Sequence, residues 1–145
     1  MEKPQNKYEQ EELINYCINR EIKRPKTSII TAMKYLIVLE LATLLISYIV
    51  AKLLVFVGFN FSFILLHFFV SVVLLITFYK RFSILFIELY QHYASEEKRR
   101  KCTLKPSCSE YAIMVLNKYG MFKAFKKIYI RLFITCNGIY NIDNP

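Results

Sequence analysis

The sequence predicts an all-α membrane protein, in which a two-helix transmembrane hairpin is followed by a small three-helix amphipathic, cationic module. Two neighbouring apolar runs of about 20 residues indicate the hairpin. Apolar residues beyond them recur at helical spacing. Of the nine net positive charges on the 145-residue chain, seven lie in residues 80–145. The chain is therefore divided into an N-terminal segment (1–34), the hairpin (35–79) and the cationic module (80–145).

Two runs of the sequence are long and apolar enough to cross a bilayer. Tyr35–Val57 is interrupted only by Glu40 and Lys52. Phe59–Phe78 contains no Asp, Glu, Lys or Arg. About 20 helical residues cover a hydrocarbon core ~30 Å thick, so both runs are predicted to span. Glu40 and Lys52 are expected to reach the interface from near the ends of their run, with the alternative that Glu40 faces a partner helix.

Short polar signals mark the ends of these spans. Thr27 and Ser28 are plausible caps of the first helix, and Gly58 with Asn60 is expected to form the turn between the two. His67 lies near the middle of the second span. A neutral imidazole that hydrogen-bonds to the neighbouring helix is the favoured interpretation, ahead of a proton relay.

The distribution of basic residues predicts the orientation. The connecting loop carries no charge, whereas both outer flanks are basic: Lys23, Arg24, Lys26, Lys34, Lys80 and Arg81. Positive flanks remain cytoplasmic, so both termini are expected on that side. The charged and polar first 28 residues are not typical of a secretory signal peptide. A basic surplus beside an apolar stretch favours an anionic lipid surface as partner over nucleic acid.

The N-terminal segment contains a thin helical stripe. Its apolar positions between Tyr8 and Lys23 are Leu13, Ile14, Cys17, Ile18 and Ile22. This spacing predicts a short amphipathic helix that lies on the membrane or on the rest of the protein. It does not indicate a function.

The cationic module begins with a third apolar pattern. Its stripe consists of Phe82, Leu85, Phe86, Leu89 and Tyr93. This pattern predicts an amphipathic helix that leaves the bilayer along its surface. The charged segment Ser95–Lys101 is expected to be a loop.

The second helix of the module has clear boundary signals. Ser107 and Glu110 form the S-x-x-E capping box, and Pro106 prevents the helix from extending backwards. Gly120 is predicted to end the helix in the left-handed conformation. Ser107 and Ser109 are interpreted as caps and not as nucleophiles. The expected buried face comprises Tyr111, Ala112, Val115 and Leu116.

The third helix is predicted over about residues 122–135. Its apolar stripe comprises Phe125, Ile128, Tyr129 and Leu132. The basic residues expected to face lipid, here and in the preceding loop, are Lys98, Arg99, Arg100, Lys101, Lys123, Lys126, Lys127 and Arg131. The tail from Asn137 is expected to be polar and turn-like. Helices this short need a membrane, a partner or a covalent link to be stable.

The module contains three cysteines, Cys102, Cys108 and Cys136, and Cys17 is far away in sequence. A zinc site usually has four ligands in closely spaced pairs, and only His92 offers a nearby imidazole. A disulfide from Cys136 to either partner is disfavoured in a reducing cytoplasm. A nucleophilic Cys108 in a first helical turn lacks an accompanying base. The favoured interpretation is that the cysteines are small buried hydrophobes, with no cofactor or metal.

From about Ile84 to Pro145 the chain resembles the membrane-protein insertion efficiency factor family, also called YidD-like or the haemolytic domain family. The resemblance is carried by a P-S-C-S-x-Y block after a cysteine, with Y-G and R-L-x-x-x-C behind it. The matching residues are Cys102, Pro106, Ser107, Cys108, Ser109, Tyr111, Tyr119, Gly120, Arg131, Leu132, Cys136, Asp143 and Pro145. The tail around Asn137–Gly138 and Asn141–Ile142 departs from the family pattern.

The resemblance implies a small bacterial inner-membrane protein that assists the insertion of membrane proteins beside the insertase and translocon. It implies no cofactor, and it does not explain the first 79 residues. We therefore expect a non-enzymatic accessory factor that acts on nascent membrane proteins. The alternatives are a membrane-lytic protein and a cysteine-dependent enzyme acting on lipid or acyl groups. Nucleic acid is not an expected partner, because aromatic residues are not interleaved with the basic ridge.

Overall fold

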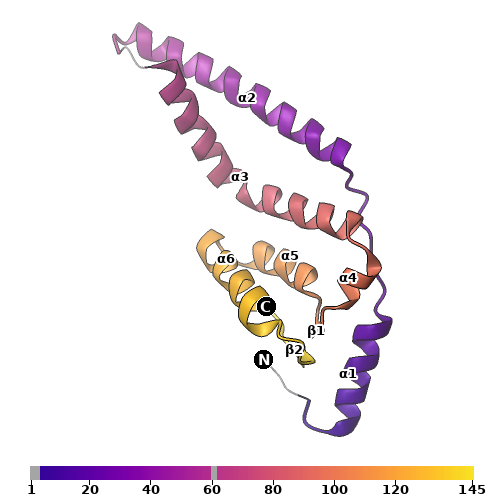
Figure 1. Ribbon diagram of the computed structural model, residues 1–145. Coiled ribbons are helices and arrows are strands. Elements are labelled where there is room, and N and C mark those ends of the chain that lie inside the picture. The colour runs from indigo at the N-terminus through magenta and orange to yellow at the C-terminus, as the bar shows by residue number, and fades with distance from the viewer. Residues whose placement is uncertain (1–3, 60–61) are drawn as a thin grey trace. The chain divides into compact units, whose positions relative to one another are not determined.

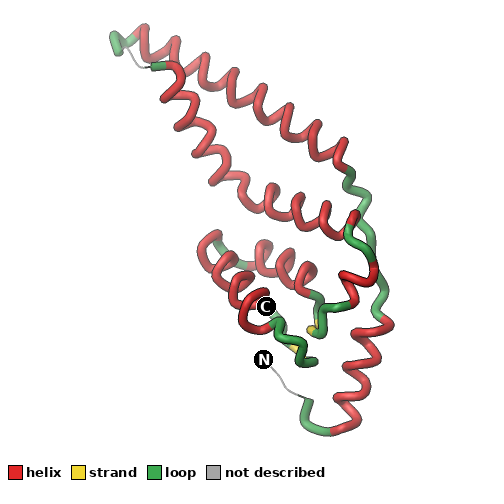
Figure 2. Tube along the Cα trace, viewed as in Figure 1, coloured by secondary structure: helices red, strands yellow, loops and turns green. Residues whose placement is uncertain are grey.

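The computed structural model describes residues 4–59 and 62–145 and is predominantly helical (Figures 1 and 2). The chain forms two compact units: Ser28–Phe82 is one, and Met1–Thr27 with Ser83–Pro145 is the other. We call them the spanning unit and the thiol unit. The expected turn residue Asn60 lies outside the described residues.

The spanning unit consists of helix α2 (Ile29–Phe56) and the first part of helix α3 (Phe63–Tyr93). Both helices are long and apolar enough to cross a membrane, and their apolar side chains are largely exposed. Such surfaces are expected of helices that contact lipid. Ser28 caps α2 as predicted, because its Oγ accepts a hydrogen bond from the Thr31 amide at 3.2 Å.

Helix α3 is longer than predicted. The sequence indicated a span ending at Phe78 and a separate amphipathic helix beginning at Phe82, whereas a single helix continues to Tyr93. Lys80 and Arg81 make this stretch polar, but both residues are good helix formers. Residues 79–93 contain no glycine or proline that would end the helix. Helix α3 therefore continues unbroken, although its first part is apolar on all sides and its last part is amphipathic.

Polar side chains of the spanning unit gather between its two helices. His67 of α3 lies 3.1 Å from Ser47 Oγ and 3.4 Å from Glu40 Oε1, both on α2. Thr43 and Ser47 are buried, and each donates to a backbone carbonyl one turn earlier. The prediction that His67 contacts the neighbouring helix is confirmed. Glu40 faces the partner helix, the alternative to reaching the interface.

The thiol unit combines helices with one small parallel strand pair. Its elements are α1 (Lys7–Asn19), the end of α3, α4 (Glu96–Arg100), β1 (Leu104–Lys105), α5 (Cys108–Lys118), α6 (Met121–Ile130), the π-helical turn η1 (Arg131–Thr135) and β2 (Asn141–Ile142). Leu104 pairs with Asn141, and Lys105 with Ile142. The tail expected to be turn-like therefore contributes a strand, and the fold is not entirely helical.

The segment predicted as a charged loop contains helix α4. Ser95 Oγ accepts a hydrogen bond from the Lys98 amide at 3.4 Å, which caps the first turn. Glu96 and Glu97 occupy that turn and basic residues occupy the last, as the helix dipole favours. Ion pairs join Arg100 to Glu96 and Lys101 to Glu97. The prediction overlooked this capping pattern because the segment has no apolar periodicity.

The connection between α5 and α6 also differs from the prediction. Gly120 has φ −68° and ψ 164°, so it is not left-handed, and it caps the start of α6. Helix α5 ends at Lys118, and its C-cap residue Tyr119 is itself extended. Two successive extended residues reverse the chain without a positive φ. Gly58 is the glycine that ends a helix in the left-handed region, with φ 93° beyond α2.

The core of the thiol unit lies between α5, α6 and β1. Helices α5 and α6 lie side by side (Figure 1). The predicted buried face of α5 is confirmed, with Val115 and Leu116 fully enclosed. The buried residue of α6 is Ala124, whereas the residues of the predicted stripe are half-buried or exposed. Phe125, by contrast, is 47% exposed.

Candidate functional site

Three thiols from separate elements converge in the thiol unit. Cys102 lies between α4 and β1, Cys108 begins α5, and Cys136 caps the end of η1. Their Sγ atoms all lie within 4.8 Å of one another. The Sγ atoms of Cys102 and Cys108 are 3.4 Å apart. All three are free thiols and are partly buried. The sequence favoured small buried hydrophobes, and it did not predict that the three sulfur atoms lie together.

The surroundings favour one thiolate, at Cys102. The hydrogen bond between the Cys102 and Cys108 Sγ atoms lowers the pKa of Cys102 to about 5, against the opposing effect of burial; the backbone amides of Leu104 and Cys108 and the charge of Arg20 act in the same direction as this hydrogen bond. The same contact, together with burial, raises the pKa of Cys108. Burial raises the pKa of Cys136. The cluster can therefore hold a negative charge that neighbouring donors stabilise.

The start of α5 explains why Cys108 is placed here. The predicted capping box is confirmed: Ser107 Oγ accepts from the Glu110 amide at 3.4 Å, and the Glu110 carboxylate accepts from the Ser107 amide at 2.9 Å. Amides in a first helical turn have no intrahelical acceptor. The Cys108 amide instead donates to Cys102 Sγ at 3.3 Å. The cap thus orients the Cys108 amide so that it stabilises negative charge on Cys102 Sγ.

A buried ion pair lies next to the cluster. Arg131 is 1% exposed and donates to Asp143 Oδ2 at 2.5 Å and to the Asp143 carbonyl at 2.7 Å. Its other terminal nitrogen donates to the Pro106 carbonyl at 2.5 Å, and its guanidinium stacks 4.2 Å from the Tyr111 ring centre. The prediction that Arg131 faces lipid is wrong, because this side chain joins the C-terminal tail to the start of α5.

The N-terminal segment contacts the rest of the thiol unit through its arginines and its main-chain carbonyls. Arg20 is 8% exposed and donates to the backbone carbonyls of Cys17 and Cys102. Arg99 donates to the carbonyls of Lys23 and Gln91. Arg99 was predicted to face lipid, but in the structure its guanidinium binds main-chain carbonyls of the protein.

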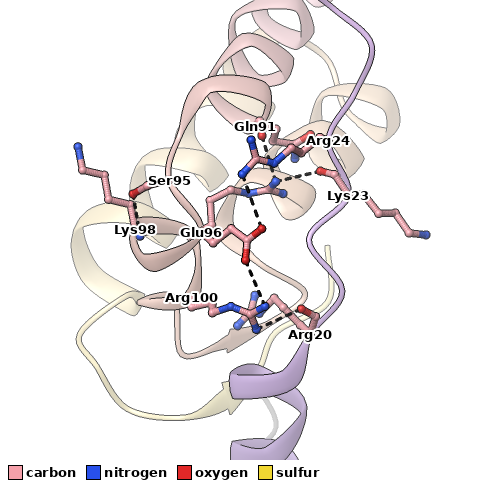
Figure 3. A network of polar contacts seen from close by, with 9 residues as sticks. Arg20, Lys23, Arg24, Gln91, Ser95, Glu96, Lys98 and Arg100 are labelled. Carbon is pink, nitrogen blue, oxygen red and sulfur yellow. Dashed lines mark hydrogen bonds and ion pairs between the residues drawn. The ribbon is translucent and has the colours of Figure 1, made fainter.

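Further polar contacts join the N-terminal segment to α4. Arg24 and Arg100 both approach the Glu96 carboxylate at 3.7 Å (Figure 3). Arg100 also donates to the carbonyls of Ile18 and Arg20. The sequence offered no signal for these contacts, because the partners are about 80 residues apart and the donors bind main-chain carbonyls.

A cavity of about 310 Å³ opens beside the thiols within the thiol unit. Cys102 and Cys108 line it, together with apolar side chains of α3 and α6 and the polar groups of Arg20, Arg99 and Glu110. Ser109 also lines it and accepts a hydrogen bond from Gln91 Nε2 at 3.0 Å.

The remaining residues of the family pattern include Tyr119, Leu132 and Pro145. The Tyr119 ring is surrounded by the ammonium groups of Lys118, Lys123 and Lys127, at 5.6, 4.7 and 5.0 Å from its centre. Leu132 lines the cavity, and the Pro145 carbonyl accepts from Lys118 at 2.7 Å. The structure shows where Tyr119, Leu132 and Pro145 lie, and the roles that the family resemblance implies for them stay predictions.

The fold and site define a membrane-associated, mostly helical protein with a basic, thiol-bearing unit. The model of the YidD family, described as "Putative membrane protein insertion efficiency factor", matches residues 79–142. A protein of Aquifex aeolicus with the same description is 32% identical over 68 residues, which cover 46% of this chain and 98% of that protein. The chain belongs to the membrane protein insertion efficiency factor family.

Other relatives align with the same part of the chain. A protein of Desulfitobacterium hafniense with this description is 43% identical over 53 residues, or 37% of this chain and 77% of the relative. An uncharacterised 7.9 kDa protein of Haemophilus phage HP1 is 46% identical over 50 residues, or 34% and 74% of the two chains. No solved structure matches this chain.

Proposed function

We propose that this protein is a non-enzymatic accessory factor that assists the insertion of integral membrane proteins into the bacterial inner membrane. Helices α2 and α3 would form a transmembrane hairpin with both termini in the cytoplasm, and the helices of the thiol unit would lie against the anionic inner leaflet. Family membership supports the insertion-related role. Two exposed apolar helices and basic outer flanks support the anchor and its orientation.

The observation that carries this proposal is an exposed apolar face on α6 and η1. Phe122 is 84% exposed, Tyr129 60% and Phe133 73%. The Tyr129 and Phe133 rings are neighbours, with centres 4.7 Å apart, and Leu132 and Ile134 are exposed as well. Contiguous apolar surface of this kind marks contact with a membrane or with an apolar partner. The face would shelter the apolar segments of emerging membrane proteins beside the insertase and translocon.

Basic residues on the same helix support a position at the lipid surface. Lys123, Lys126 and Lys127 follow the start of α6. Each cation near an anionic leaflet contributes ~1 kcal/mol to binding, so several together suffice to dock the unit.

Site-specific photo-crosslinking tests the proposal. A photoreactive amino acid at Phe125 or Leu132 should crosslink to nascent membrane proteins during synthesis in the presence of inner-membrane vesicles. The same group at Glu97, on exposed helix α4, is the matched control and should crosslink far less. An absence of crosslinks from both Phe125 and Leu132 would contradict the proposal. Leakage of dye from liposomes on addition of the full chain would instead support the lytic alternative.

A further inference from the structure

The three thiols form a constellation that an insertion role does not require. We propose that Cys102, Cys108 and Cys136 bind a single thiophilic d10 cation, Zn(II) or Cu(I), through three thiolates. Soft sulfur ligands select these ions over Mg²⁺ and Ca²⁺. Each metal–sulfur bond forms to a thiolate, and a sulfur that still carries its proton releases that proton to solvent.

The sulfur positions suit such an ion. Zinc–sulfur bonds are about 2.3 Å long, so a cation in the plane of three sulfurs holds them ~4.0 Å apart. The three Sγ atoms already lie within 4.8 Å of one another, and the Cys102 and Cys108 pair is 3.4 Å apart. Small rotations about the Cα–Cβ bonds close the remaining difference without any movement of the backbone.

The backbone around the ligands is held independently of a metal. The capping box determines the position of Cys108. The Arg131–Asp143 pair and the Arg131–Pro106 contact connect η1, which carries Cys136, to the start of α5. Because these contacts hold the three backbone segments together, ligand side chains from three elements are brought together before a cation arrives. Such preorganisation is expected of a binding site and is not needed by cysteines that only fill space.

The environment compensates the charge of three thiolates. The Cys108 amide donates to Cys102 Sγ at 3.3 Å, an outer contact of the kind that supports metal-bound ligands. Arg20 is bound to the Cys102 carbonyl and is 8% exposed. Its Nη1 atom is buried and has no hydrogen-bond partner within residues 4–59 and 62–145. The Arg20 guanidinium is therefore a buried cation with an unused donor, and it could stabilise the negative charge of a metal–thiolate centre.

One coordination position would remain open. Among the described residues, no fourth cysteine, histidine, aspartate or glutamate joins the cluster. His92 is engaged elsewhere, because its Nδ1 donates to the Pro25 carbonyl at 2.7 Å. Three thiolates satisfy Cu(I), whereas Zn(II) would take water or another exchangeable ligand in the fourth position. Cys102 and Cys108 line the 310 Å³ cavity, which offers room for such a ligand.

Metal titration of the full chain tests the proposal. The protein would be purified in detergent micelles under anaerobic conditions with a non-thiol reductant, stripped with a chelator, and titrated separately with Zn(II), Cu(I) and the spectroscopic probe Co(II). We expect one equivalent of metal per chain and a thiolate-to-cobalt charge-transfer band. Competition between Zn(II) and Cu(I) against indicators of known affinity then identifies the preferred ion.

The four cysteines provide matched variants. Cys136→Ser should lose stoichiometric binding, whereas Cys17→Ser, which alters the buried cysteine of α1 outside the cluster, should retain it. Circular dichroism and gel filtration would check that both variants fold. Absence of stoichiometric binding to the reduced wild-type chain would overturn the proposal without reference to any variant. Binding that survives in Cys136→Ser, or a disulfide in freshly isolated protein in place of metal, would also overturn it.

Discussion

Each unit of the molecule contains a close pair of polar side chains, and the two pairs are built differently. In the thiol unit, the Arg131 and Asp143 side chains are 1% and 17% exposed, and the arginine makes three hydrogen bonds to the tail and to Pro106. In the spanning unit, the His67 and Glu40 side chains are 24% and 61% exposed and lie 3.4 Å apart. The first pair is enclosed by protein, and the second is open on one side.

The difference shows how the surroundings of a polar pair determine its contribution to stability. Removal of one member of an enclosed pair leaves a charge with neither a partner nor water, which is strongly destabilising. Removal of a polar contact between membrane helices has a smaller effect, because the separated helices also find partners for their polar groups. The Arg131 pair should therefore be a structural link, and the His67 cluster a modest helix–helix contact.

The largest expected effect is that of Asp143→Ala. This substitution leaves the Arg131 guanidinium buried without its counter-ion and should lower the free energy of unfolding of the thiol unit by about 3–5 kcal/mol. Pulse proteolysis in micelles over a urea series measures the loss. Lys118→Met, which removes an exposed lysine contact to the same tail, is the control and should change stability by less than about 0.5 kcal/mol. Equal effects of the two variants would contradict the assignment of Arg131 as a structural link.

A second prediction concerns the reactivity of the thiols in metal-free protein. Because the pKa of Cys102 is lowered to about 5, its thiolate is already formed at pH 6. Its rate of alkylation by iodoacetamide should stay nearly constant between pH 6 and pH 8. The pKa of Cys136 is raised, so its rate should increase about tenfold per pH unit, or about a hundredfold over this range.

Peptide mass spectrometry after brief alkylation measures both rates in one sample. Short exposures are needed, because modification of one thiol removes a hydrogen-bond partner of the next. The unfolded chain is the control, and there the two rates should rise together with pH. A Cys102 rate that increases as steeply as that of Cys136 in the folded chain would show that the contacts from Cys108 and Arg20 do not stabilise a thiolate.

A third, smaller effect is expected at the capping box. Ser107→Ala removes the acceptor for the Glu110 amide and should cost the thiol unit about 1 kcal/mol. Ser95→Ala is a matched control, because it removes the cap of α4, a five-residue exposed helix, and should cost no more than about 0.5 kcal/mol. Pulse proteolysis measures both, and a larger loss for Ser95→Ala would reverse the order of importance inferred here.

The sequence predicted those features that depend on local signals. The capping box at Ser107 and the buried face of α5 follow from neighbouring residues, and both are confirmed. The meeting of the three thiols depends on the return of the tail to β1 and on the Arg131–Asp143 pair, which no local pattern encodes. Arg131 was misassigned because one arginine in a basic ridge cannot be distinguished from the others by spacing alone.

The smallest expected effect returns to the spanning unit. His67→Phe removes the contacts to Ser47 and Glu40 and should weaken association of α2 with α3 by about 0.6 kcal/mol, the average for polar contacts between membrane helices. Unfolding by increasing SDS in mixed micelles measures it. Thr77→Val is the control, since that hydroxyl donates to the Val73 carbonyl of its own helix. A loss of 3 kcal/mol or more would mean that the His67 cluster is as enclosed as the Arg131 pair, and that lipid alone does not surround these helices.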